Sequence, residues 1–346
     1  MLNQAWENFV TAAQGGEPES VPVALNVDCG FIASAFGMNA LDFYMYPDRW
    51  LDAYVTLMAR FPDVVFLPGF WVEFGMSAEP SAFGTPVMWR HDQAPAMRHL
   101  NLSQADWGRL PQPDPYSDGL MALVLRRYWN LEHNAELPEP HRVHFVAARG
   151  PFTIATHVLG GNQFLAALDG EPNSTGAALD VLEIFAETTI RFLRAQLGCL
   201  REPLGVVVLD DTAGMLTPDA FTHFAAPFLR RIFNTFDGLV RVFRCDTPCR
   251  PLLPQMPDLG FEVFHFSHRM DIREVRAVLG PKIALMGNVS ALEIMARGVP
   301  EQVESAGHEC IARAGRSSAL ILSAAGTVLS GTPTENIDAL VRATRH

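Results

Sequence analysis

The residues best suited to chemistry follow short apolar runs that end in polar side chains. Asp210 and Asp211 end the run GVVVLDD, and Cys245, His265 and His268 follow two later runs. Two adjacent carboxylates after an apolar strand are costly unless one is paired or hydrogen-bonded, and they can serve as a general acid or base or as metal ligands. The alternative is that one of them caps the turn DDTAG. We predict that at least one of the two is functional.

Glu73 is a further candidate, in the segment WVEFGMSAEPSAFG. The segment sets this carboxylate among Trp71, Met76 and Phe83. An apolar wall with few polar groups is typical of a small-molecule pocket. A packed loop with Glu79 in solvent is the equally weighted alternative.

Cys245 can supply a thiolate to a metal ion, and His265 or His268 can supply an imidazole nitrogen. The His-x-x-His spacing is a weak signal by itself, and a structural histidine is the alternative for each. If an ion such as zinc is bound, we expect Cys245 and one of these histidines to hold it, with Glu73 or an aspartate completing the set. The strands that carry them would be neighbours in a barrel.

The elements that must position these residues alternate between strands and helices. Apolar runs such as IALMG hand over to helical patterns such as DIREVRAVLG, which is the signature of βαβ units on a parallel sheet. Pro47 and the pair Thr217-Pro218 are placed to start helices. Eight strands are expected, over residues 21–28, 64–71, 142–149, 205–211, 239–245, 261–266, 282–287 and 319–323.

Eight such units predict an α/β fold, a single (β/α)8 TIM barrel over residues 1–346. The carboxyl ends of its strands converge on one mouth, where the chemistry sits. Residues 72–140 show no clear period and are expected to form an irregular insertion over this mouth. The side chains expected to bind a small-molecule substrate there are Asn26, Asp28, Trp71, Met76, Phe83, Arg149 and Asn288.

Composition excludes several partners. A formal net charge of −12 argues against nucleic acid, which needs clustered positive charge. No apolar run is long enough to suggest a membrane span. The N-terminus MLNQAWENF lacks the features of a signal peptide, and the five scattered cysteines fit reduced thiols, so we expect a cytoplasmic protein. Neither a phosphate-binding loop nor a nucleophile elbow is present.

Several ordered segments resemble the uroporphyrinogen decarboxylase superfamily, more closely its branch of cobalamin-dependent methyltransferases. The resemblance covers roughly residues 20–343 and is strongest from residue 145 onward. It implies a TIM barrel and a corrinoid-dependent activity. The segments that carry it are GPFTIATHVLGG, VVVLDDTAGMLTPDAFTHFAAPFLRRIF, KIALMGNVSALEIMARGVPEQV and LILSAAGTVLSGTPTENIDALVRA.

The departures from the family patterns narrow the activity. The decarboxylase holds its substrate with an arginine-rich N-terminal loop and has a late histidine, but the matching segments here, NVDCGFIASAFG and SAAGTV, have neither. A tetrapyrrole octacarboxylate is therefore a poor substrate for this acidic chain. The zinc methyltransferases use His-x-Cys and a later Cys. Cys245 matches the first cysteine, whereas the other two positions read Phe243 and Ala324-Ala325-Gly326.

We therefore expect a methyltransferase that moves a methyl group between a small donor, such as a methoxy-aromatic, and a corrinoid protein. Breaking a methyl ether needs an acid for the leaving group. Its catalytic residues would come from Asp210, Asp211, Glu73 and His265. The open alternatives are a cofactor-free decarboxylase of a small carboxylic acid and a non-catalytic binding barrel. The sequence leaves the oligomeric state open, with a homodimer as one option.

Overall fold

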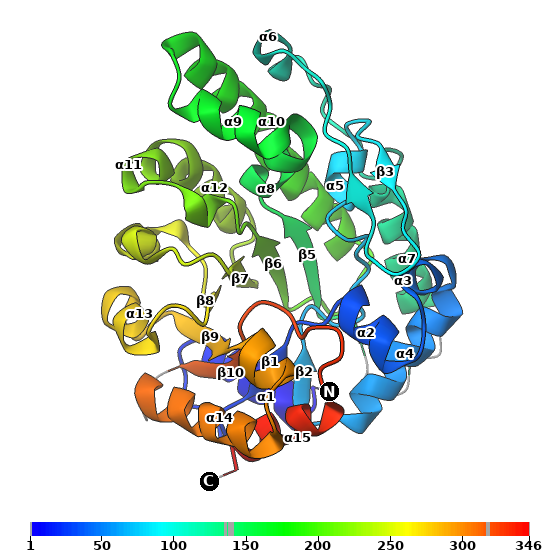
Figure 1. Ribbon diagram of the computed structural model, residues 1–346, viewed down its shortest axis with the longest axis vertical. Helices are drawn as coiled ribbons and strands as arrows, with labels where there is room; N and C mark the ends of the chain where they lie inside the picture. The colour runs from blue at the N-terminus through cyan, green and yellow to red at the C-terminus, as the bar shows by residue number, and fades with distance from the viewer. Residues whose placement is uncertain (1, 135–136, 138–141, 316–318, 346) are drawn as a thin grey trace.

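The computed structural model describes residues 2–134, 137, 142–315 and 319–345 and shows one curled sheet of parallel strands surrounded by helices (Figure 1). The strand order is β2-β1-β10-β9-β8-β7-β6-β5, so neighbours in the sheet follow the chain around the barrel. All eight strands fall within or next to the ranges expected from sequence, and the predicted (β/α)8 fold is confirmed. The strands are β1 Val23–Leu25, β2 Val64–Phe66, β5 Phe145–Arg149, β6 Gly205–Leu209, β7 Val240–Cys245, β8 Val263–Phe266, β9 Ala284–Val289 and β10 Leu320–Ala324.

The helices cover the outer face of this sheet (Figure 1). Pro47 begins α4, and Thr217 accepts a hydrogen bond from the Ala220 N–H at the start of α11, as expected. No described helix is both long and apolar enough to cross a membrane. The helices outside residues 72–140 are α1 Gln4–Ala13, α2 Cys29–Ala35, α3 Ala40–Met45, α4 Pro47–Arg60, α8 Pro151–Ala155, α9 Gly161–Leu168, α10 Pro172–Leu197, α11 Pro218–Ala220, α12 Ala226–Thr235, α13 Ile272–Leu279, α14 Pro300–Ala314 and α15 Thr334–Arg342.

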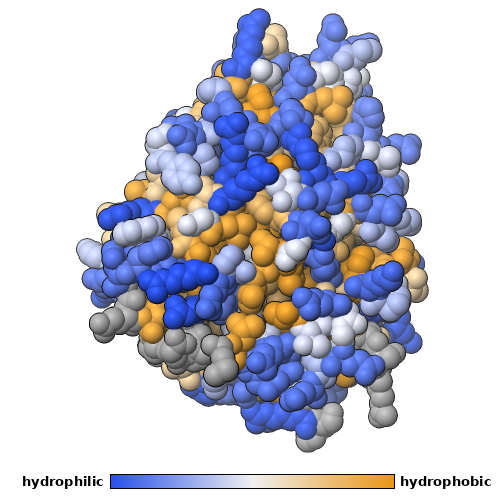
Figure 2. Space-filling view, turned by 180° about the vertical axis from the view of Figure 1, so that it is seen from behind, coloured by the Kyte–Doolittle hydropathy of each residue, from blue (hydrophilic) through white to orange (hydrophobic). Residues whose placement is uncertain are grey.

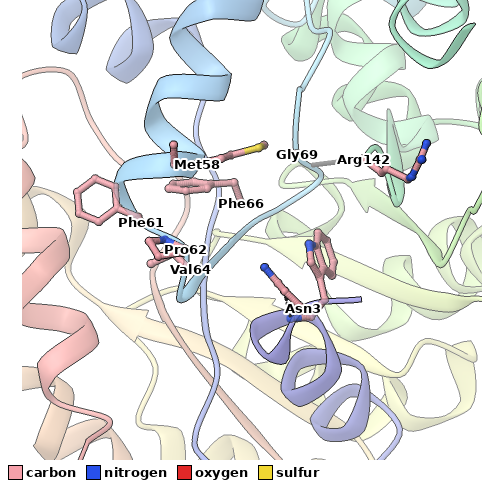
Figure 3. Close-up of a pocket in the computed structure, with 10 residues that line it drawn as sticks. Asn3, Met58, Phe61, Pro62, Val64, Phe66, Gly69 and Arg142 are labelled. Atoms are coloured by element: carbon pink, nitrogen blue, oxygen red, sulfur yellow. Dashed lines mark hydrogen bonds between the residues drawn. The ribbon is translucent and has the colours of Figure 1, made fainter. Parts of the chain in front are cut away.

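The amino-terminal helix α1 closes the end of the barrel at which the strands begin. Trp6 and Phe9 of α1 both contact Phe145 at the start of β5, with ring centroids 5.7 Å apart in each pair. A cavity of about 240 Å³ remains there, and in Figure 3 the side chains of Asn3 and Met58 face it from opposite sides. This end lies away from the carboxyl ends of the strands, which carry the chemistry in such barrels.

Residues 72–140 are more regular than their sequence predicts. They contain α5 Ala78–Ser81, β3 Val87–Met88, β4 Ala96–Met97, α6 Gln104–Trp107 and α7 Met121–His133. Figure 1 shows this segment running along one side of the barrel, from α7 near α4 to α6 beside α10. The amide of Gln112 donates to the Thr188 hydroxyl of α10 and ties the segment to the barrel.

Alternation along β7 decides which of its side chains face the barrel interior. The Phe243 ring packs 5.8 Å from Phe233 of α12, which belongs to the outer layer of helices. Successive strand side chains point to opposite faces. Arg244 therefore points into the barrel, and Cys245 points outward beneath the helices.

The register of the parallel ladder extends this pattern to the next strand. Arg244 pairs with His265, and Cys245 pairs with Phe266. Residues that pair in a parallel ladder share a face, so His265 also points inward.

Polar and charged side chains cover most of the margin of the molecule in Figure 2, whereas apolar side chains gather in a hollow near the middle of that face.

Two glycines allow a test of the packing. A Cβ at Gly205 in β6 would lie 2.1 Å from Phe145 Cε1 and 2.3 Å from the Val240 carbonyl oxygen, whereas a Cβ at Gly176 in α10 meets nothing within 4 Å. Gly205→Ala should destabilise the protein by about 1–3 kcal/mol through overpacking. Gly176→Ala should stabilise it by about 0.5–1 kcal/mol by lowering the entropy of the unfolded chain. Urea unfolding midpoints measure both, and equal shifts would contradict this description of the core.

Candidate active site

A buried arginine occupies the mouth of the barrel at the end of β7. The Arg244 side chain is 10% exposed, and its Nη1 lies 3.9 Å from Asp211 Oδ2. Burial raises the pKa values of Asp28 and Asp246, and the positive charge of Arg244 opposes that rise in both. The charge of one guanidinium thus acts on carboxylates from the ends of β1, β6 and β7.

The loop after β10 packs closely on this cluster. A Cβ at Gly326, where φ is +73°, would lie 2.5 Å from Asp246 Oδ2 and 3.5 Å from Arg244 Nη2. Only glycine fits such a close approach with a left-handed backbone. The segment SAAGTV, which lacks the histidine of the decarboxylases, therefore supplies backbone to the mouth.

The adjacent aspartates predicted as catalytic have different surroundings. Asp210 is fully buried and accepts hydrogen bonds from the Phe152 N–H at 3.1 Å, the Thr153 N–H at 2.8 Å and the Thr153 hydroxyl at 2.9 Å. It thus caps the start of α8, although burial raises its pKa to about 7. Asp211 is partly exposed, accepts from the Asp246 N–H at 2.6 Å and faces Arg244. Of the two, Asp211 lies in the mouth.

His265 points into the barrel but is held by a carbonyl group. Its Nε2 lies 2.9 Å from the Ala324 carbonyl oxygen, which requires the N–H tautomer at that nitrogen. Burial, followed by the charge of Arg244, lowers its pKa to about 4. His265 is therefore neutral near pH 7 and connects the ends of β8 and β10.

Glu73 is a buried acid next to the mouth. Its Oε1 accepts a hydrogen bond from the Tyr44 hydroxyl at 2.8 Å. Burial, followed by the charge of Asp28, raises its pKa to about 7, while the charge of Arg149 opposes that rise. Near neutral pH, a substantial fraction of Glu73 therefore carries a proton.

Arg149 lies beside Glu73 and is fixed on three sides. Its Nη2 donates to the Gly75 carbonyl oxygen at 3.0 Å, and its guanidinium stacks 5.2 Å from the Trp71 ring centroid. Its backbone N–H donates to Glu79 Oε1 at 2.7 Å. Glu79 is buried, so the alternative of a packed loop with Glu79 in solvent does not hold. These residues surround a cavity of about 20 Å³ next to Glu73.

The other predicted substrate residues lie apart from this cavity. Asn26 donates to the Leu67 carbonyl oxygen at 2.8 Å, and Asn288 donates to the Met270 carbonyl oxygen at 2.8 Å, so both amides tie loops together. The Phe83 ring packs edge-on against Phe185 of α10. Met76 is 42% exposed, and its sulfur lies 3.2 Å from His157 Nε2.

The structure does not assemble the predicted metal ligands. Cys245 and His265 point to opposite faces of the sheet. The Cys245 sulfur lies against Gly214, where an added Cβ would be only 2.4 Å away. His268 is a third exposed and faces Glu293 across 3.8 Å. Among the described residues, no group of three His, Cys, Asp or Glu side chains is placed to hold an ion.

The inward position at the end of β7 also corrects the match to the zinc methyltransferases. The two positions matched to their His-x-Cys ligands, Phe243 and Cys245, both face outward here, beneath the helices. The inward side chain between them is the guanidinium of Arg244, which cannot ligate zinc. The residues of this mouth therefore do not fit the zinc site that the family resemblance implies.

Two functional candidates were missed from the sequence. Arg244 and Tyr44 both take part in the buried charge and hydrogen-bond network around the mouth. Arg244 had no clear signal, because alternation alone does not tell which of Phe243 and Arg244 points inward. Tyr44 had none either, since it comes from a helix that precedes Glu73 by 29 residues.

Replacing Arg244 by glutamine should destabilise the protein by about 3–5 kcal/mol near pH 7.5, because the carboxylates of Asp28, Asp211 and Asp246 lose their buried counter-charge. The deficit should shrink at pH 5, because the pKa values of Asp28 and Asp246 are raised by burial and rise further without the guanidinium, so that both carboxylates bind protons in the folded state as pH falls. Urea unfolding at both pH values measures it. Arg250→Gln, which removes an exposed ion pair with Glu274, is the control and should cost less than about 1 kcal/mol. A pH-independent deficit for Arg244→Gln would contradict the assignment.

Purified protein should contain zinc well below one ion per chain, and Cys245→Ser should leave that content unchanged. Elemental analysis after exposure to equimolar zinc and desalting measures both. One zinc per chain that disappears in Cys245→Ser would show that the outward thiolate is a ligand.

The comparisons with known proteins agree with this architecture. The uroporphyrinogen decarboxylase (URO-D) family model matches residues 4–346. Uroporphyrinogen decarboxylase from a Synechococcus species is 26% identical over 291 residues, which cover 80% of this chain and 74% of the relative. A methylated-thiol–coenzyme M methyltransferase from Methanosarcina mazei is 25% identical over 198 residues, covering 56% of this chain and 50% of that protein.

A solved structure of a methyltransferase from Methanosarcina mazei has the same fold. It superimposes with a TM-score of 0.82 and covers 98% of this chain and 97% of its own, at 18% identity. The family match extends over nearly the whole sequence, through every strand of the barrel and every residue of the mouth. The chain belongs to the uroporphyrinogen decarboxylase family, a family that includes relatives of both the decarboxylase and the methyltransferase type.

Proposed function

We propose that this protein transfers a methyl group from a small methoxy-aromatic donor to the corrinoid of a partner protein. The observation that carries the proposal is Glu73, a buried carboxyl group whose pKa is raised to about 7 beside the aromatic ring of Trp71. The relation to a methyltransferase and the lack of a cationic N-terminal loop support methyl transfer over decarboxylation of a tetrapyrrole.

Glu73 would act as the acid for the leaving group. The bond between the methyl carbon and the ether oxygen breaks, the oxygen takes the proton of Glu73, and the methyl group passes to the corrinoid. An alkoxide or phenoxide leaves more easily when it is protonated in the transition state. The Tyr44 hydroxyl, 2.8 Å from Glu73, fixes the position of the acid.

The donor would enter where residues 71–75 border the cavity beside Glu73, next to Met76. That cavity of about 20 Å³ holds no more than about one water molecule. Donor binding therefore involves displacement of side chains in this segment, which carries the exposed Met76. The position of residues 72–140 over the mouth stays a prediction of this proposal.

Decarboxylation of a small carboxylic acid is a second candidate, favoured by one observation. The Arg149 guanidinium borders the same cavity as Glu73 and can hold a carboxylate there. Loss of carbon dioxide leaves a carbanion, which Glu73 would protonate.

The test of methyl transfer is the cobalamin spectrum during incubation of the protein with cob(I)alamin and a panel of methoxy-aromatics. Methylcobalamin should form with at least one donor, and Glu73→Gln should lower the rate about 10²–10⁴-fold because the acid is lost. The rate of the unchanged protein should fall as pH rises through about 7, because Glu73 loses its proton there.

Glu183→Gln, at a largely exposed carboxylate of α10 that pairs with Arg231, is the matched control and should keep the full rate. Measuring carbon dioxide from small aromatic and aliphatic acids in parallel separates the decarboxylase. If neither methylcobalamin nor carbon dioxide forms, the result supports a binding barrel without catalysis. A Glu73→Gln variant with full activity would show that Glu73 is not the acid.

A further inference from the structure

A second hollow lies outside the barrel mouth, between α4 and α7. Its volume is about 590 Å³, within the range of small-molecule sites. Glu73, Arg149 and Arg244 do not line it, but Tyr44 does, and the hydroxyl of this tyrosine bonds to Glu73. The hollow is therefore a separate site that meets the candidate active site at Tyr44 and at Phe74, which also lines the cavity beside Glu73.

Three aromatic rings form one wall of this hollow. Tyr44 stacks on Phe74 with centroids 5.5 Å apart, and Trp89 meets these rings edge-on at 5.9 Å and 6.1 Å. Trp89 is nevertheless 42% exposed, and Met45 and Leu123 on the same hollow are 60% and 54% exposed. Large apolar side chains gathered at one exposed place mark a binding surface more often than scattered ones do.

Two arginines from α7 provide positive charge beside the rings. Arg127 lies 5.4 Å from the Trp50 and Phe74 ring centroids and donates to the Tyr44 carbonyl oxygen at 2.8 Å. Its burial lowers its pKa. Arg126 is exposed at the rim. Within the described part of the chain, the ion pairs with carboxylates involve other arginines and histidines, so Arg126 and Arg127 have no carboxylate within 4.0 Å.

We propose that this hollow binds a small aromatic carboxylate, with its ring against Trp89 and its carboxylate on Arg126 and Arg127. Aromatic faces match a planar ring, and an arginine with no carboxylate beside it among the described residues matches the carboxylate of a ligand. A chain with a net charge of −12 repels anions over most of its surface. The two arginines therefore make this hollow a place where an anionic ligand is attracted. Asp48 is the one acidic residue of the lining, and it lies in the first turn of α4, where the helix dipole favours its charge.

The competing occupants fit less well. A neutral aromatic molecule would bury Arg127 further and offer no negative charge to balance the guanidinium. A cation would be repelled by both arginines. A second copy of this chain would have to offer a carboxylate on an aromatic surface. The inference does not depend on methyl transfer, because it concerns binding alone.

The probe is 2-naphthoate, and the measurement is titration calorimetry with tryptophan fluorescence in parallel. We expect saturable binding of one ligand per chain, with 2-naphthamide binding at least 10-fold more weakly. Trp89→Ala and Arg126→Gln each alter an exposed side chain and should weaken 2-naphthoate binding at least 10-fold and about 5-fold. Tyr116→Ala removes an aromatic ring that is 69% exposed elsewhere, and should leave binding unchanged.

The inference is overturned if 2-naphthoate does not saturate the protein below millimolar concentration, or if the amide binds as tightly as the acid. If Trp89→Ala binds 2-naphthoate as tightly as the unchanged protein, the ligand lies elsewhere and the inference is overturned as well. Light scattering on the same samples tests self-association. A dimer that Trp89→Ala dissociates would assign this surface to a second copy of the chain instead.

Discussion

The burial of one guanidinium at the end of β7 organises the mouth of this barrel. Arg244 faces inward because the strand alternates, and the parallel register turns His265 to the same side. A buried cation is stable only with negative charge nearby, and carboxylates at the ends of neighbouring strands supply that charge. Asp211 and Asp246 meet it, and the loop after β10 can approach only because residue 326 is glycine. Changes at this arginine would therefore spread to every strand end around it.

A fixed guanidinium gives the mouth a chemistry different from that of a metal site. It cannot accept an electron pair from a thiol, but it can offer five hydrogen-bond donors in a plane. The charge is permanent and its position is set by the backbone. Members of one family can thus share the barrel and the direction of its strands while they differ in what holds the reactants, because activity belongs to the site and not to the fold.

The fold could be predicted from the sequence, because apolar runs and helical periods recur eight times and each supplies a local signal. The candidate site could be predicted only in part. Asp211 and Arg149 follow from the ends of their strands, but Cys245 was preferred to Arg244 because a strand that is apolar on both faces does not reveal which side points inward. The burial of Glu79 could not be decided from the sequence, because its partner, the backbone N–H of Arg149, lies 70 residues away. Long-range contacts of this kind leave no trace in local pattern.

Tyr44 belongs to two places at once. Its ring forms a wall of the hollow beside α7, and its hydroxyl binds Glu73. Proton binding at Glu73 and ligand binding at the ring are consequently linked equilibria. A ligand that turns the ring changes the proton affinity of the carboxyl group, and by reciprocity the proton changes the affinity for the ligand by the same factor. Through this one side chain, binding at the surface of the barrel can be coupled to protonation in its interior.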